Sequence, residues 1–277
     1  MASQTPATAG TVATLWRYPV KSMMGEELNA AAVTDRGLLG DRAYALVDLQ
    51  DGKVASAKNP RKWPRLFAFR AAYLEPPEIA QAIPPVRIAL PDGATITSRD
   101  HDVDQVVSAA VGRQVALRAA PPEKPSLEEY WPDMEELDRR DTVTDEAMPT
   151  ETFFDAAPLH LVTTATLDTL GKSYPEGRFE VRRFRPNLVI EAGPSETGFP
   201  EDAWLGRTIR IGNEVRISVT GPCPRCVMTT LAQGDLPADP GILRTAARQH
   251  KAHVGVYAKV LRGGIVRRGD LVAFEEQ

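Results

Sequence analysis

Residues 207–230 read Arg-Thr-Ile-Arg-Ile-Gly-Asn-Glu-Val-Arg-Ile-Ser-Val-Thr-Gly-Pro-Cys-Pro-Arg-Cys-Val-Met-Thr-Thr. The first part alternates apolar and polar residues around Gly212-Asn213, which is typical of two antiparallel strands joined by a tight turn. The last part contains both cysteines of the chain, Cys223 and Cys226. Because its prolines exclude a regular helix, we expect a rigid, exposed loop at the end of a strand.

The pair of cysteines is compatible with several kinds of site. Arg225 precedes the second thiol, and a neighbouring cation favours the thiolate that binds metals or attacks electrophiles. A disulfide is disfavoured because the chain opens without a secretory signal and the cytosol is reducing. Zinc shared with His250 and His253 is disfavoured because zinc fingers usually space their histidines more widely. Pro224 does not suit a thioredoxin-like redox pair, and two inert structural cysteines remain an alternative.

The rest of the chain predicts more strands than helices, and the strands arrive in hairpins. Asp51-Gly52 and Pro91-Asp-Gly93 are turn signals between apolar runs, whereas Thr163 or Thr164 and Asp239-Pro240 are helix starts. We therefore expect a mainly β fold with some α, an α+β protein built as an antiparallel barrel or sandwich. The expected strands are 11–18, 40–48, 66–74, 86–90, 94–98, 115–119, 186–190, 208–211, 215–219, 253–261 and 271–274, and the expected helices lie in 102–111, in 163–170 and after 239.

Changes in composition divide the chain into four parts. Residues 1–10 have neither basic residues nor an apolar core and are predicted to be a disordered lead. Residues 11–120 are predicted to form an N-terminal β-rich domain, and residues 151–277 a second one. Residues 121–150 are acidic, rich in proline and weakly periodic, which predicts an inter-domain connection or a mobile loop over a site.

Bulk composition excludes several functional classes. The chain has 277 residues, 43% of them hydrophobic, which suffices for one large domain or two smaller ones. A net charge of −4 and 6% aromatic residues argue against a general nucleic-acid binder. The apolar runs are far shorter than the roughly 20 residues of a membrane span. We therefore expect a cytoplasmic protein that acts on neither nucleic acid nor membrane.

Two predicted strand ends carry candidate anion-binding residues. Lys21 and Ser22 follow the first strand and offer a point charge and a hydroxyl, and Arg42 stands at the start of another strand. Taken singly, these residues are equally compatible with solvated loops, and Asp41 could simply pair with Arg42. The residues alone leave both interpretations open.

Six short motifs, taken together and in order, resemble a known family. They are Tyr18-Pro-Val-Lys-Ser22, Gly40-Asp41-Arg42, Phe184-Arg-Pro-Asn187, Cys223-Pro-Arg-Cys226 with Thr229-Thr230, Val256-Tyr257 and Gly269-Asp270. The chain resembles the MOSC-domain proteins from about Thr11 to about Phe274. It is most similar to the two-part branch that contains the mitochondrial amidoxime-reducing component and its bacterial relatives.

The resemblance implies a fold, a cofactor and a set of site residues. The fold would be an N-terminal β-rich domain followed by a MOSC β-barrel domain, and the cofactor would be the molybdenum cofactor, Mo-molybdopterin, without pyridoxal phosphate. Cys226 would be both the metal ligand and the catalytic residue. Residues 160–167 resemble another cofactor-lining stretch, although Thr164 and Thr166 replace an acidic residue and a serine of some relatives. The implied cofactor-binding residues are Lys21, Ser22, Arg42, Thr166, Arg185, Asn187, Cys226 and Tyr257.

The resemblance also implies a reaction, the reduction of N-hydroxylated substrates such as hydroxylamines and amidoximes to amines or amidines. His160 and His253 are candidate proton donors. Two cysteines cannot build an iron–sulfur cluster and no dinucleotide-binding glycine motif is present, so we expect electrons from a separate electron-transfer protein or reductase. Two alternatives remain: a sulfur carrier holding a persulfide on Cys226, and a non-catalytic cofactor-binding protein.

Overall fold

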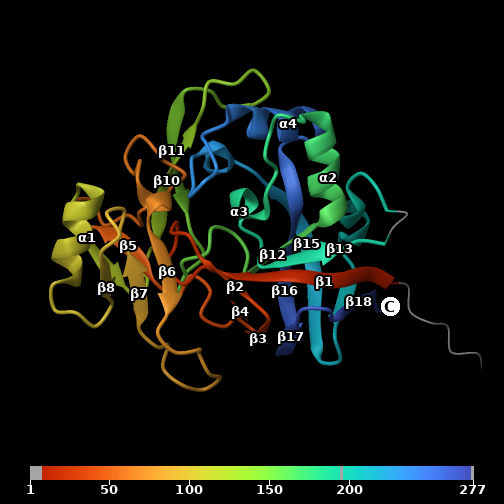
Figure 1. The fold of residues 1–277 in the computed structure, drawn as a ribbon, viewed down its shortest axis with the longest axis horizontal. Helices are drawn as coiled ribbons and strands as arrows, with labels where there is room; N and C mark the ends of the chain where they lie inside the picture. The colour runs from red at the N-terminus through yellow and green to blue at the C-terminus, as the bar shows by residue number, and fades with distance from the viewer. Residues whose placement is uncertain (1–7, 194–195, 276–277) are drawn as a thin grey trace, which may run out of the picture.

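A closed barrel of seven strands forms the larger part of the molecule (Figure 1). In the computed structural model, which describes residues 8–193 and 196–275, each barrel strand pairs with its neighbour and the last pairs with the first. In order around the barrel the strands are β13 (Leu188–Glu191), β12 (Leu159–Thr163), β16 (His253–Arg262), β15 (Val215–Pro224), β14 (Thr208–Ile211), β18 (Leu271–Phe274) and β1 (Thr8–Arg17). A short strand, β2 (Glu26–Leu28), extends the sheet beside β1.

The period-two pattern of the sequence explains the barrel core. Ile209 and Ile211 of β14 lie opposite Ile217 and Val215 of β15, and all four are buried. Alternate residues of a strand point to opposite faces, so the apolar members fill the barrel while Arg210 and Arg216 stay outside. The predicted hairpin is therefore confirmed, and so is the mainly β fold with some α.

The N-terminal part packs smaller sheets around a second core, on the left of Figure 1. Its parts are β5 (Ala45–Asp48) paired with β9 (Val115–Arg118), the sheet β6 (Arg70–Tyr73), β7 (Val86–Ala89) and β8 (Thr95–Thr97), and α1 (Val103–Val111). A further sheet joins β3 (Ala30–Thr34) and β4 (Gly37–Leu38) to β17 (Gly264–Arg267) near the end of the chain. β1 pairs with β13 and β3 pairs with β17, so strands from the two ends of the chain share sheets.

Several predicted boundaries were wrong by a few residues. Residues 1–7 of the expected lead lie outside the described part of the chain, but residues 8–10 already belong to β1. The expected strand 40–48 is ordered as a strand only from Ala45, and the expected strand 66–74 opens with the 3-10 turn η1 (Leu66–Ala68). β15 continues through Cys223 to Pro224, so the first cysteine lies in a strand rather than in a loop.

The helices cover the barrel on one side. They are α2 (Thr164–Ser173), the short α3 (Val181–Phe184) and α4 (Pro240–His250), accompanied by the 3-10 turns η2 (Pro200–Trp204) and η3 (Val227–Thr230). The predicted caps are confirmed: Thr163 accepts from the Thr166 amide, and Asp239 accepts from the Gly241 amide. None of the helices in the described ranges has the length and apolar character that crossing a membrane requires.

The start of α2 contacts a buried carboxyl group, that of Glu201 in η2. The hydroxyls of Thr163 and Thr166 each lie 2.7 Å from Glu201 Oε2 and donate to it, and the three side chains are buried. Glu201 Oε1 has no partner within the described residues. Burial in this apolar setting raises the pKa of the Glu201 carboxyl. Thr166 is therefore a structural residue of this cluster.

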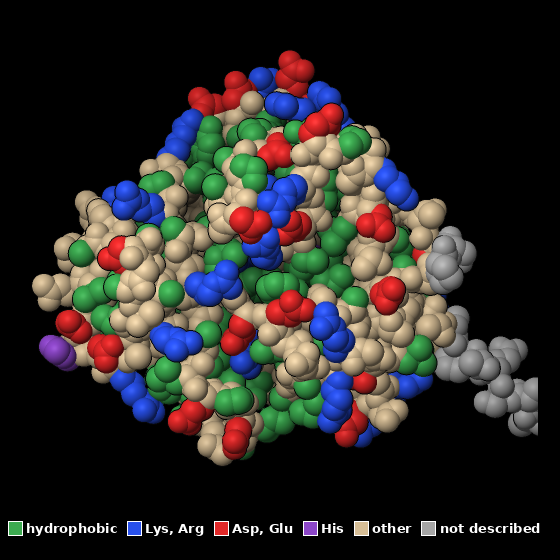
Figure 2. All heavy atoms as spheres, in the orientation of Figure 1, with side chains coloured by type: hydrophobic (Ala, Val, Ile, Leu, Met, Phe, Trp, Pro, Cys, Tyr) green, Lys and Arg blue, Asp and Glu red, His purple; other side chains and the backbone are tan. Residues whose placement is uncertain are grey.

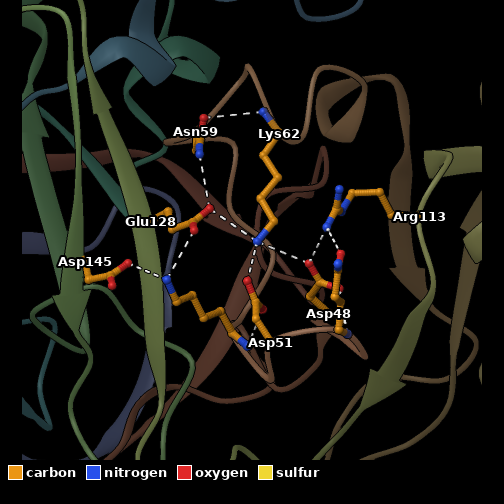
Figure 3. A network of polar contacts seen from close by, with 9 residues as sticks. Asp48, Asp51, Asn59, Lys62, Arg113, Glu128 and Asp145 are labelled. Atoms are coloured by element: carbon orange, nitrogen blue, oxygen red, sulfur yellow. Dashed lines mark hydrogen bonds and ion pairs between the residues drawn. The ribbon is translucent and has the colours of Figure 1, made fainter.

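Residues 121–150, predicted to lack regular structure, contain a β-hairpin of β10 (Ser126–Trp131) and β11 (Thr142–Ala147). Ion pairs attach this hairpin to the N-terminal part (Figure 3). Lys62 Nζ lies 2.6 Å from Asp51, 3.1 Å from Asp48 and 3.3 Å from Glu128 of the hairpin. The acidic composition that suggested a solvated linker instead supplies the partners of a basic loop.

Charged residues of both signs are also intermixed on the outer surface (Figure 2). Around α3, for example, Arg178 and Arg182 each pair with Glu180 and with Asp235.

Because Lys62 belongs to this ion-pair network, we predict that its substitution destabilises the protein more than substitution of the neighbouring Arg61. Lys62→Met should lower the free energy of unfolding by about 1–3 kcal/mol, because it leaves the buried carboxylate of Asp48 with one cation fewer. Arg61→Met removes an ion pair with Asp141 whose side chains are 57% and 62% exposed, and should cost about 1 kcal/mol or less. Urea unfolding measures both values. Equal losses would show that the network does not anchor the hairpin.

The buried Glu201 predicts a dependence of stability on pH. A carboxyl whose pKa is raised on folding stabilises the protein most below its unfolded pKa of about 4.3, and that contribution is lost as pH rises through the folded pKa. Glu201→Gln cannot titrate, so its stability relative to the wild type should rise from about pH 5 to about pH 8. Urea unfolding at both pH values tests this, with exposed Glu176→Gln as the control. A pH-independent difference would contradict the raised pKa.

Candidate functional site

A small cavity lies where the loop after β1, the segment before β12 and the ends of β13, β15 and β16 meet. Its free volume is about 50 Å³. Four cationic side chains line it, one each from Lys21, Arg42, Arg185 and Arg225. The remaining lining residues include Ser22, Asp155, His160, Asn187 and Tyr257. The structure thus brings six of the predicted cofactor-binding residues to one place: Lys21, Ser22, Arg42, Arg185, Asn187 and Tyr257.

The backbone after β1 fixes Lys21 and Ser22 in the wall. The Lys21 amide donates to Tyr44 O at 2.8 Å, and Ser22 adopts a left-handed conformation with φ of 61°. Ser22 Oγ accepts from the Ala57 amide at 3.1 Å, which leaves its own hydroxyl hydrogen able to donate. Lys21 is 4% exposed, and its ammonium group donates to Phe153 O at 2.8 Å and to Asp155.

Asp41 connects Arg42 of the wall to Tyr18 and Asn187. Its carboxylate accepts from the Tyr18 amide at 2.8 Å and from Asn187 Nδ2 at 2.9 Å, and it also pairs with Arg42. The ring of Tyr18 lies beside both guanidinium groups, 4.9 Å from that of Arg42 and 4.0 Å from that of Arg185. The expected Asp41–Arg42 pair is therefore present, and it helps to build the cavity.

Two arginines retain unused hydrogen-bond donors. Arg185 Nη1 donates to Met23 O at 2.7 Å, but its Nη2 is buried without a partner in the described part of the chain. The Nε of Arg225 is also buried and, within the same residues, has no partner. A buried donor without an acceptor costs about 1–3 kcal/mol, and more for a charged group. The wall therefore has donors suited to an anionic ligand.

The thiols differ in their surroundings. Burial alone would raise the pKa of the Cys223 thiol, but Arg225, with His160 and Tyr257, outweighs it and lowers that pKa to about 6. Arg225 Nη1 lies 2.8 Å from Cys223 Sγ. Burial and the Glu129 carboxylate raise the pKa of Cys226 to about 12, against the opposing effect of Lys58 and Arg225.

Arg225 does lower the pKa of the second thiol, as expected, but burial and Glu129 outweigh it, and the guanidinium group makes its hydrogen bond to Cys223. The chain stays extended through Cys226, whose φ and ψ are −128° and −172°. Residues two apart on an extended chain point to the same side, which directs Arg225 towards Cys223. Cys226 is half-buried against the core of the N-terminal part, and its neighbours Arg225 and Met228 line the cavity.

His160 and Tyr257 lie on adjacent barrel strands, and a glycine permits their approach. They are register partners, and their rings meet edge to face at 6.0 Å between centroids. Gly255 has φ of +81°, and a Cβ there would lie 2.2 Å from Leu161 O and 2.5 Å from His160 Nε2. His160 Nε2 lies 2.9 Å from Val254 O, so this nitrogen carries the hydrogen that it donates. Gly255 therefore keeps His160 in this position.

Three predictions do not coincide with the cavity. Cys226, the predicted metal ligand, does not line it, although Arg225 and Met228 on either side of it do. Thr166 is absent from its wall because its hydroxyl points to Glu201. His250 and His253 lie away from it, since the His250 ring stacks on Phe199 and its Nε2 lies 2.7 Å from Asp202 Oδ2. In residues 8–193 and 196–275, no group of three or more metal-binding side chains assembles, so the zinc alternative finds no support.

Sequence reasoning missed two charged residues at this site. Asp155 lines the cavity, and Lys58 lies between Asp155, at 3.8 Å, and Glu129 of the hairpin, at 3.0 Å. Lys58 opens the basic loop 58–65, whose charge was visible but whose partners lie in distant segments. Asp155 stands alone between apolar residues, and nothing local marked it.

Comparison with known proteins places the chain in a family. Residues 9–104 match the MOSC N-terminal beta barrel domain and residues 149–273 match the MOSC domain. Mitochondrial amidoxime reducing component 2 of Macaca fascicularis is 30% identical over 80% of this chain and 67% of the relative. Molybdenum cofactor sulfurase of Drosophila grimshawi is 28% identical over 87% of this chain and 31% of the relative. The crystal structure of the YuaD protein from Bacillus subtilis covers 97% of both chains, with a TM-score of 0.48 and 12% identity.

The two domain matches occur in the order that the sequence motifs predicted, and together they span both parts of the fold. The relatives are named for amidoxime reduction and for the molybdenum cofactor, which indicates a function connected with that cofactor. The chain belongs to the MOSC-domain family that includes the mitochondrial amidoxime reducing components.

Proposed function

We propose that the chain binds the molybdenum cofactor in this cavity and reduces N-hydroxylated compounds. The observation that carries the proposal is a pair of buried guanidinium donors on Arg185 and Arg225 that have no partner among residues 8–193 and 196–275. Both arginines line one cavity, and Arg225 directly precedes Cys226. The names of the relatives support the same chemistry. The substrate would be a hydroxylamine or an amidoxime, and the product an amine or an amidine.

The donors in the wall fit the anionic end of molybdopterin. Phosphate favours guanidinium forks and hydroxyl donors, which Arg42 and Ser22 supply together with the ammonium group of Lys21. Arg185, Asn187 and Tyr257 would border the rest of the cofactor. Sites for ligands of drug size usually enclose ~300–1,000 Å³, whereas this cavity has about 50 Å³. Part of the wall must therefore move when the cofactor binds.

Cys226 would supply the thiolate that ligates the metal. A soft sulfur donor suits molybdenum held by other sulfur ligands. The pKa of this thiol is raised to about 12 by burial and Glu129, so metal binding would release a proton from it. When bound, the cofactor supplies the two-electron centre at which the N–O bond is broken. The overall reaction takes up two electrons and two protons and yields one water.

His160 is better placed than His253 to handle a proton. His160 lines the cavity, and its Nε2 hydrogen is committed to Val254 O, so Nδ1 is the atom able to accept or release a proton. His253 is outside the wall, and burial lowers its pKa. This difference favours His160 of the two histidines that the sequence offered.

Sulfur transfer is a second candidate function. The match to a molybdenum cofactor sulfurase extends over 87% of this chain, and Cys226 could carry a persulfide instead of a metal. A third candidate is a protein that holds the cofactor without turnover. A cytoplasmic location also stays a prediction, because the amidoxime-reducing relatives are mitochondrial by name.

Chemical analysis of the purified chain distinguishes these candidates. Molybdenum, pterin and cyanolysable sulfur are measured per chain, and turnover of an aromatic amidoxime is followed with reduced viologen. Metal and pterin together with turnover support the proposal. A persulfide without metal selects sulfur transfer, and cofactor without turnover selects a carrier.

The two thiols should respond differently to substitution. Cys226→Ser should abolish turnover and remove most of the molybdenum, because serine does not provide the soft ligand. Cys223→Ser, the matched control three residues away, should retain most of the metal and the activity. Metal content by mass spectrometry and turnover provide two readouts. Identical behaviour of the two variants would favour a site that uses both thiols.

Electron supply should require another protein. In the described residues the chain has two cysteines and no dinucleotide-binding glycine motif, so NADH alone should not support turnover. Addition of reduced viologen, or of a flavoprotein reductase with a small electron carrier, should start the reaction. Sustained NADH-driven turnover by this polypeptide alone would reveal an additional redox site.

A further inference from the structure

We propose that the Asp155 carboxylate occupies the place beside Lys21 that a phosphate group would take, and that it moves away when a phosphate-bearing ligand binds. By this competition it would weaken the binding of inorganic phosphate and other small anions. The inference rests on the proposed function for the identity of the full ligand. The new element is the competition between the Asp155 carboxylate and a phosphate group for Lys21.

The contacts of Lys21 are the first evidence. Its ammonium group donates to Phe153 O at 2.8 Å and forms an ion pair with Asp155 Oδ1, so two of its three hydrogens are used within the chain. Lys58 approaches the same carboxylate, at 3.8 Å from Oδ2. In contrast, Arg185 Nη2 and Arg225 Nε, on two other side chains of the wall, have no partner in the described part of the chain. The Lys21 end of the wall is thus already paired with an anion, whereas Arg185 and Arg225 each retain a donor for a ligand.

Burial indicates which partner would move. The Lys21 side chain is 4% exposed and follows β1, whereas the Asp155 side chain is 32% exposed. Asp155 lies in the stretch between β11 and β12, from residue 148 to residue 158, which forms neither helix nor strand. Segments without ladder hydrogen bonds open at lower free energy than barrel strands do. The carboxylate, rather than the lysine, is therefore the mobile member of the pair.

The size of the cavity requires such a movement. Its free volume of about 50 Å³ is far below the ~300 Å³ of a small-molecule site, and Phe154 and Asp155 both contribute to the wall. Phe154 also lines a neighbouring cavity of about 230 Å³, which shares Arg42 with the first. Retreat of this segment would open the wall between the two cavities and release Lys21 in one step.

Competition of this kind selects for ligands with many contacts. A ligand shifts an equilibrium only by its difference in affinity for the two states, so it must compensate for breaking the Asp155–Lys21 pair. Inorganic phosphate has only the cations available to it. A larger ligand that also contacts Arg185, Asn187 and Tyr257 gains additional binding free energy, which offsets the cost of breaking the Asp155–Lys21 pair.

The test measures inorganic phosphate binding to the full-length chain produced in a host that cannot make molybdopterin. Isothermal titration at constant ionic strength compares the wild type with Asp155→Asn, which removes the charge at nearly constant size. Asp155→Asn should bind phosphate at least about tenfold more tightly. Asp155→Glu keeps the charge and should bind as weakly as the wild type. Asp141→Asn makes the same change of charge at a 62% exposed side chain and should have no effect.

The outcomes separate this inference from the proposed function. Equal or weaker phosphate binding by Asp155→Asn would overturn it and would instead make Asp155 a residue that orients Lys21 for the ligand. Hydrogen exchange on the wild type gives a second measurement that does not depend on a variant folding. Amides of residues 153–157 should exchange faster in saturating pyrophosphate, and slower or unchanged exchange would contradict the displacement. Neither experiment uses molybdenum content or turnover, on which the proposed function depends.

Discussion

The carboxylate of Asp41 accepts a hydrogen bond from the amide of Tyr18, another from the side chain of Asn187, and pairs with Arg42. It is buried, and these partners come from the loop after β1, from the approach to β13 and from its own turn. One charged group therefore fixes three segments that are distant in sequence. Loss of this carboxylate would leave Arg42 and the Asn187 amide without a shared acceptor, at a cost expected for a broken buried pair.

Around Asp41 the molecule buries more positive charge than it neutralises locally. The guanidinium groups of Arg42 and Arg185 both lie against the Tyr18 ring, at 4.9 and 4.0 Å from its centroid. Burial lowers the pKa of Arg185 to about 10, which still leaves it cationic at neutral pH. Such an arrangement is costly unless an anion completes it. Asp155 completes one end in this structure, and the pKa of its carboxyl is held well below the ordinary range by Lys21 and Lys58 against the effect of burial. The charge balance of the wall thus connects the fold to the proposed ligand.

Local sequence patterns predicted the strands in which apolar residues, which face the core, alternate with polar residues, which face solvent. β14 and the first part of β15 follow from their period-two patterns, and the caps at Thr163 and Asp239 follow from side-chain chemistry. The hairpin of β10 and β11 was missed because Leu127 is its only residue in the apolar cluster with Ala45 and Val54, among the described residues. Ion pairs make the other attachments to the N-terminal part, so the strands do not alternate as an apolar face would. The assignment of β1 to the barrel depends on pairing with residues more than 170 positions away, which no local pattern contains.

The motifs predicted most of the residues of the site but not the contacts that these residues make. The motifs located Lys21, Ser22, Arg42, Arg185, Asn187 and Tyr257, all of which line the cavity. They did not reveal that Arg225 turns to Cys223, because that depends on how far β15 continues, nor that Thr166 serves Glu201, because that acid lies on a separate turn. The residue types identified the candidate site residues. The side chains that these residues contact depend on the length of the strands and on packing between segments distant in sequence.

The proposed function depends on the buried cations beside Cys226 binding the anionic end of a molybdenum cofactor. This is tested by a crystal structure of the protein purified with its metal, with anomalous diffraction recorded on both sides of the molybdenum absorption edge. We expect one molybdenum peak within bonding distance of Cys226 Sγ, with a phosphate held by Lys21, Ser22 and Arg42. A molybdenum peak elsewhere, or a cofactor whose phosphate lies away from these residues, would contradict it.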